Sequence, residues 1–121
     1  MTANEFRRIA LKLPSAIESA HMGHPDFRAN GKIFATLHPG DKTGMIKLTP
    51  EQQQHFLSAD SATFTPASGA WGRQGCTMVR LESADEDQIG EAMTLAWQET
   101  VRLAKQPKKK PTGKTTKKSR K

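Results

Sequence analysis

The stretch that decides the fold is Phe27-Arg-Ala-Asn-Gly-Lys-Ile-Phe-Ala-Thr-Leu37. Its centre, Asn30-Gly31, is the strongest short-range signal for a β-hairpin, because both central residues of the favoured turn need a positive φ. After the turn the side chains alternate, which predicts a strand with one set on each face: Ile33, Ala35 and Leu37 on the first, and Lys32, Phe34 and Thr36 on the second. We therefore expect an antiparallel meander in this half of the chain.

The residues before the hairpin predict a helix followed by a strand. Thr2 and Glu5 have the spacing of a capping box. Apolar residues then recur at helical spacing from Phe6 to Leu13, and Pro14 ends the helix because it disfavours the α conformation in the residue before it. Residues 17–22 predict an opening strand.

The residues after the hairpin predict further strands and two helices. The expected elements are a strand at 45–48, a helix from Thr49-Pro50 to about Ala59, an edge strand at 64–66, a glycine-rich loop at 69–75, a strand at 77–81, and a long helix that ends near Ala104 after a capping box at Ser83–Glu86. The order is helix, three strands, helix, two strands, helix. It predicts an α+β domain over residues 1–105, with helices packed on an antiparallel sheet.

Charge is divided unevenly along the 121 residues, whose net charge is +7. Up to Glu99 there are nine basic and twelve acidic residues, a net charge of −3. After Glu99 there are ten basic residues and no acidic ones. Residues 106–121 also lack any aliphatic or aromatic side chain, so this segment is predicted to be a disordered basic tail.

The compartment is expected to be the cytoplasm. The single cysteine, Cys76, cannot form an internal disulfide, which suits a reducing environment. The first residues lack the apolar core of a signal peptide, and no apolar run approaches the roughly 20 residues that span a bilayer. Membrane insertion is therefore not expected.

The glycine-rich loop, Gly69-Ala-Trp-Gly-Arg-Gln-Gly75, has two interpretations. Trp71 could stack on a nucleic-acid base while Arg73 contacts a phosphate. Alternatively, Trp71 packs back on the strands and the glycines only shape a wide turn. The loop leads into a strand, so it lacks the helix N-terminus with which a nucleotide fingerprint holds a pyrophosphate.

No residue set predicts a reaction, a metal site or a cofactor. His21 and His24 could ligate a metal with His38 or His55 as a third ligand, but their spacing fits structural or exposed histidines better. The acidic residues 85–87 are explained by helix capping, and Cys76 has no motif partner that would make it a nucleophile. We expect no enzyme activity.

Basic residues supply the candidate nucleic-acid contacts. Arg28, Lys32, Lys47, Arg73 and Arg80 lie on the hairpins, the loop and the last strand; together they form a basic strip if they converge, and ordinary solvated charges if they scatter. The tail adds eight positive charges that attract polyphosphate without choosing a sequence, or that merely solubilise the protein: Lys108, Lys109, Lys110, Lys114, Lys117, Lys118, Arg120 and Lys121.

Several strings resemble the YjbR/MmcQ family of small bacterial proteins. They are His24-Pro-Asp-Phe27, Gly31-Lys-Ile-Phe-Ala35, Lys47-Leu-Thr-Pro-Glu51, Trp71, and Val79-Arg-Leu81 before the last helix. The resemblance covers about residues 3–104. It implies a fold similar to secretion-chaperone-like α+β domains, and DNA binding through a double-wing arrangement of hairpins.

Two functions are therefore expected. The first is DNA binding of low specificity, with the tail contacting phosphates and the hairpins and the Trp71 loop orienting the domain. The alternative is a protein- or peptide-interaction module without catalytic activity, which an apolar patch beside Phe34 and Met78 would favour. The oligomeric state is left open.

Overall fold

The computed structural model describes residues 1–21, 23–38, 40 and 42–105. The elements follow the order α1 (Ala3–Leu11), β1 (Ala16–His21), β2 (His24–Ala29), β3 (Lys32–Leu37), β4 (Thr43–Lys47), α2 (Pro50–Ala59), β5 (Phe64–Pro66), α3 (Gly69–Arg73), β6 (Cys76–Arg80), the 3₁₀ turn η1 (Leu81–Ser83) and α4 (Glu86–Lys105). The predicted tail over residues 106–121 lies outside the described residues.

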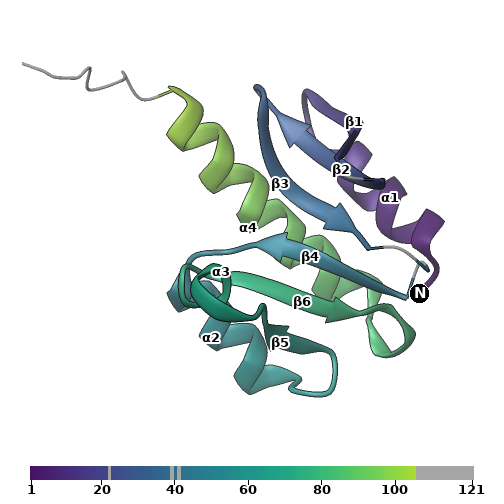
Figure 1. Ribbon diagram of the computed structural model, residues 1–121, viewed down its shortest axis with the longest axis vertical. Helices are drawn as coiled ribbons and strands as arrows, with labels where there is room; N and C mark the ends of the chain where they lie inside the picture. Colours follow the sequence, from purple (N-terminus) through teal and green to yellow (C-terminus); the bar gives the residue numbers. More distant parts are fainter. Residues whose placement is uncertain (22, 39, 41, 106–121) are drawn as a thin grey trace, which may run out of the picture.

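Six antiparallel strands form one sheet in the order β1-β2-β3-β4-β6-β5, so β1 and β5 are its edges. Helices α1 and α4 lie behind the sheet in Figure 1, and the viewer looks onto the other face, which we call the open face. The predicted α+β class is confirmed. The predicted order counted three strands before the second helix, whereas the structure has four, β1 to β4.

The central hairpin forms as predicted, with positive φ angles of 52° at Asn30 and 82° at Gly31. The prediction that Phe34 and Ala35 face opposite sides of the sheet is wrong. The register shifts between Phe27 and Arg28, so Phe34 has no partner on β2. At such a β-bulge the extra residue re-aims its side chain, and both Phe34 and Ala35 are fully buried.

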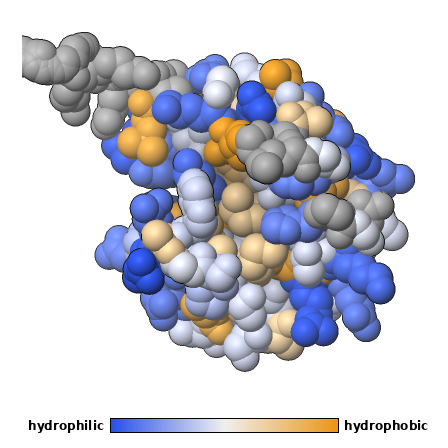
Figure 2. Space-filling model, in the orientation of Figure 1, coloured by the Kyte–Doolittle hydropathy of each residue, from blue (hydrophilic) through white to orange (hydrophobic). Residues whose placement is uncertain are grey.

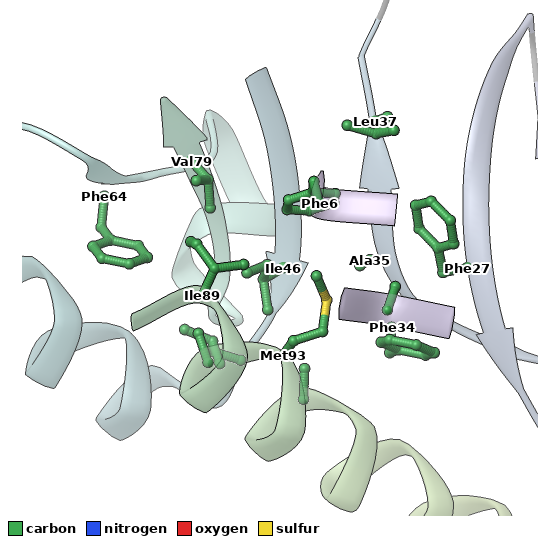
Figure 3. Packing of buried hydrophobic residues seen from close by; sticks show 14 of the residues in the cluster. Phe6, Phe27, Phe34, Ala35, Leu37, Ile46, Phe64, Val79, Ile89 and Met93 are labelled. Carbon is green, nitrogen blue, oxygen red and sulfur yellow. The ribbon is translucent and has the colours of Figure 1, made fainter. Parts of the chain in front are cut away.

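The core lies between the sheet and the helices behind it. Figure 3 shows Phe6 from α1 and Met93 from α4 among Phe27, Phe34 and Ile46 of the strands, and all five are fully buried. At about 1.5–3 kcal/mol for each large apolar side chain removed from water, this cluster is the main source of stability. It fixes the sheet against α1 and α4, and it leaves the open face for function.

Two predicted helix starts are confirmed and one is wrong. Capping boxes begin α1 at Thr2 and α2 at Thr49. At α4, the predicted pairing of Ser83 with Glu86 is replaced by Asp85, whose carboxylate accepts from the backbone N–H groups of residues 87 and 88 at 3.1 and 3.2 Å. The 3₁₀ turn η1 takes up Ser83, so its hydroxyl contacts residues 62 and 63 instead.

Within the described part of the chain, no helix is both long and apolar enough to cross a membrane.

Candidate nucleic-acid interface

The glycine-rich segment forms a short helix, α3, instead of a loop, and it presents Trp71 to solvent. The Trp71 side chain is 67% exposed, so the expectation that it packs on the strands is wrong. No hydrogen bond within the described residues engages its indole N–H, whereas the other tryptophan, Trp97, donates to the Pro14 carbonyl at 2.9 Å. A large flat apolar surface is therefore free at this point.

The turn that carries Trp71 is held by a buried glutamine of α2. Gln53 is 5% exposed. Its side-chain Nε2 donates to the carbonyl oxygens of Gly72 and Cys76, each at 3.0 Å. One amide thus joins α2 to α3 and to the start of β6. These buried hydrogen bonds limit how far the backbone around Trp71 moves. Trp71 is therefore exposed on a turn that is held in place.

Close backbone packing supports the same turn. A Cβ atom on Gly72 would lie 1.9 Å from the carbonyl oxygen of Ala67, a distance that only glycine allows. Gly72 is also buried, although its neighbours Trp71 and Arg73 are exposed. The glycine therefore lets α3 approach the segment after β5 closely while the two neighbouring side chains point outward.

Arg28 is on the open face but is already occupied by a carboxylate. Its Nε and Nη2 donate to the two oxygens of Asp26 at 2.8 and 3.1 Å. Asp26 is fully buried and Arg28 is half-buried. The hydrogen bond to Asp26 is the main cause of the raised pKa of Arg28. Much of its charge is compensated inside the domain, so it is a weaker phosphate ligand than a free arginine.

The other four candidate cations are exposed and unpaired within the described part of the chain. Lys32 follows the β2–β3 turn, Lys47 ends β4, Arg73 ends α3 and Arg80 ends β6. Lys47 lies opposite Cys76 in the sheet register. Burial raises the pKa of the Cys76 thiol, and the positive charge of Lys47 opposes that rise.

Lys47, Trp71 and Arg73 lie at one end of the sheet, which we call the basic end, because Lys47 is opposite Cys76 and the segment after α3 packs against the carbonyl of Leu48. In Figure 1 the end of β4 and α3 lie side by side at the lower left, whereas the β2–β3 turn that carries Lys32 lies at the top of the view. The predicted tail residues 108–121 follow α4 in the sequence, although their positions lie outside the described residues.

Arg80 does not join the basic end. Strands β4 and β6 pair from Thr43 opposite Arg80, at one end, to Lys47 opposite Cys76, at the other end. Arg80 follows Cys76 by four residue steps along β6, or about 13 Å. The structure thus brings together Lys47, Trp71 and Arg73, leaves Lys32 on the β2–β3 hairpin with the paired Arg28, and sets Arg80 apart.

Acidic residues gather at the far end of α4. Glu82 in η1 and the residues 85–87 around the helix start are exposed. Helix α4 has 20 residues, and at 1.5 Å per residue it separates this acidic end from the end of the helix by about 30 Å. The domain is therefore polarised, although its total charge is small.

The histidines considered as metal ligands are only partly brought together. The rings of His24 and His38 stack with centroids 5.6 Å apart. Burial, and then the charge of His24, lowers the pKa of His38. His55 lies on α2 with its ring against Phe56. Among the described residues no three side chains of the metal-binding types gather.

Sequence reasoning missed two residues that shape this interface, Gln53 and Asp26. Gln53 occurs in a run of three glutamines, and only its helical spacing to Phe56 indicates that it faces inward. Asp26 is two residues before Arg28, which puts both side chains on one face of a strand. This spacing in the sequence predicts the Asp26–Arg28 ion pair.

Comparison with known proteins agrees with this architecture. The YjbR family model matches residues 11–99. The chain belongs to the YjbR family. A solved YjbR-like structure with a similar fold is Deinococcus radiodurans protein DR2400, described as a DUF419 domain, with a TM-score of 0.68 and 14% identity over 88% of this chain and 89% of that one. No curated protein matches the sequence.

Proposed function

We propose that this protein is a non-catalytic, cytoplasmic DNA-binding protein that uses its basic end and the basic residues after α4. One observation carries the proposal. Trp71 is 67% exposed on a turn fixed by Gln53, the unpaired Arg73 lies on the same short helix, and the unpaired Lys47 ends the neighbouring β4. An exposed aromatic ring near free cations is the usual arrangement for contacting bases and phosphates together.

The two kinds of contact contribute differently. Stacking of one base on an aromatic ring is worth about 1–3 kcal/mol and requires a base that is not stacked in a duplex. The phosphate contacts release counterions, so the affinity falls steeply with salt and depends little on sequence. We therefore expect low specificity, with single-stranded DNA bound more tightly than a duplex of the same sequence.

The test is anisotropy of fluorescent single-stranded and duplex oligonucleotides with the full chain and with a chain ending at Lys105. We expect the shortened chain to bind single strands at about 0.15 M salt, and Trp71→Ala to weaken that binding about tenfold or more. Arg8→Ala removes an exposed charge on α1 and is the matched control. A DNA-binding role for the domain is contradicted if the shortened chain does not bind and if, in the full chain, Trp71→Ala and Arg8→Ala bind DNA equally well.

The protein-interaction alternative has one supporting observation. Met45 and Met78 are opposite each other on the open face and are half-buried, and Figure 2 shows apolar colour in the middle of that face. The second predicted member of this patch, Phe34, is in the core instead. If the domain fails the DNA test, these methionines are the first residues to examine by crosslinking to protein partners.

A further inference from the structure

A hollow of about 650 Å³ lies at the end of the open face away from the basic end. It is formed by the start of β4, by β5 and β6, by the residues before β5, and by η1. Small-molecule sites typically have volumes of about 300–1,000 Å³. None of the proposed DNA contacts at the basic end lines it.

The hollow contains a free guanidinium. Arg80 is exposed, and within the described residues its side chain makes no hydrogen bond or ion pair. Its backbone is fixed on both sides, because it is opposite Thr43 in the sheet and its N–H donates to the Thr63 carbonyl at 2.8 Å. The guanidinium is therefore anchored to a firm position while its donors remain available.

Hydroxyl groups line the hollow beside Arg80; some are hydrogen-bonded within the fold and others are not. Thr63 and Ser83 are used within the fold, since the Thr63 hydroxyl lies 2.8 Å from the Asp60 carboxylate and 2.9 Å from the Ser83 hydroxyl. Thr43 and Thr65 also line the hollow, and in the described part of the chain no hydrogen bond engages their hydroxyls. Two free hydroxyl groups and one guanidinium thus face the same space.

The remaining lining limits what can bind there. Met78 is half-buried and lies opposite Thr65, so it provides an apolar floor. Glu82 also lines the hollow and carries a negative charge two residues from Arg80. One guanidinium pairs with one negative charge, so a second charge on the ligand would stay unpaired beside the Glu82 carboxylate.

We propose that this hollow binds a small organic carboxylate. The carboxylate forms paired hydrogen bonds with the Arg80 guanidinium, the arrangement for which the two planar groups are matched. The Thr43 hydroxyl, opposite Arg80, donates to a remaining lone pair of the carboxylate, and the apolar part of the molecule rests on Met78 beside Thr65. This site is separate from the proposed DNA interface.

The experiment is a titration of the ¹⁵N-labelled full chain, followed by amide chemical shifts, with three probes that share a phenyl ring: benzoate, phenyl phosphate and benzamide. Benzoate should give saturable shifts centred on Thr43, Thr65 and Arg80. Phenyl phosphate and benzamide should bind about tenfold more weakly or worse. The substitution Glu82→Gln should improve phenyl phosphate relative to benzoate, because it removes the opposing charge.

Arg80→Ala should abolish the benzoate shifts while the spectrum elsewhere and the thermal unfolding midpoint stay unchanged. Arg8→Ala, an exposed arginine on α1, should bind benzoate like the parent protein. No saturable shift with benzoate up to about 10 mM, or equal benzoate binding by Arg80→Ala and the parent, overturns the site. Tighter binding of phenyl phosphate overturns the choice of carboxylate. Loss of DNA binding by Trp71→Ala leaves each of these results unaffected, so the two proposals fail separately.

Discussion

Replacing Gln53 by leucine tests whether one buried amide supports the turn that exposes Trp71. Leucine keeps a similar volume but removes the two hydrogen bonds, each of 3.0 Å, that Nε2 donates to the carbonyls of Gly72 and Cys76. Gln54 is the next residue of α2 and is exposed, so Gln54→Leu is the matched control.

The expected loss of stability depends on the hydrogen bonds that the Gly72 and Cys76 carbonyls retain. The Gly72 oxygen still accepts from the N–H of Gly75 at 3.0 Å, and the Cys76 oxygen from the N–H of Ala67 at 2.9 Å. Neither acceptor is orphaned, so the cost is the net value of two hydrogen bonds, about 0.5–1.5 kcal/mol each. We expect Gln53→Leu to lower the free energy of unfolding by about 2 kcal/mol and the melting temperature by about 10 °C.

Urea unfolding of the full chain, followed by circular dichroism, measures this difference. The fluorescence of Trp71 adds a local readout, since a loosened α3 changes its surroundings while Trp97 stays bonded to Pro14. If Gln53→Leu and Gln54→Leu differ by less than about 0.5 kcal/mol, the range of ordinary surface substitutions, the reasoning about the support of α3 is refuted.

Three further predictions concern stability and reactivity. A Cβ on Gly90 would meet no atom within 4 Å, so Gly90→Ala should raise the free energy of unfolding by about 0.8–1 kcal/mol in urea titrations, and any loss contradicts this. Burial, with the charge of His24, lowers the pKa of His38 in the folded protein, so below about pH 6.5 the unfolded chain binds more protons than the folded one. The stability that His38 contributes is complete above that pH and is lost as the pH falls toward its folded pKa. His38→Gln should therefore flatten the pH dependence of the unfolding free energy between pH 7 and 5. Cys76 is 3% exposed and burial raises its pKa against the opposing effect of Lys47, so Ellman's reagent should label it slowly in the native protein and rapidly in urea; equal rates would contradict its burial.

Local chemistry explains why much of the fold was predictable. Asn30-Gly31 specifies its hairpin within two residues, and the capping boxes at Thr2 and Thr49 act over one helical turn. Long-range contacts explain the errors. The burial of Phe34 depends on its register against β2, and α3 is bonded to an amide from Gln53, 19 residues before Gly72.

The candidate interface was less predictable than the fold, because charge along a sequence does not say which strand ends meet. Lys47 and Arg80 lie on neighbouring strands but at opposite ends of their pairing, which only the register reveals. Arg28 was predicted as a phosphate ligand, and its bidentate pairing with the buried Asp26 changes its role. The exposure of Trp71 follows from backbone packing that no sequence pattern expresses.

The most direct test of DNA binding at the basic end is the salt dependence of single-stranded DNA affinity, measured with the full chain so that the tail is always present. Arg73→Ala should lower the affinity and reduce the slope of log K against log salt concentration by about 0.7, the contribution of one phosphate contact to a single strand. Arg8→Ala should leave both quantities at the parent values. If Arg73→Ala and Arg8→Ala give the same affinity and the same slope, the basic end of the domain does not bind DNA.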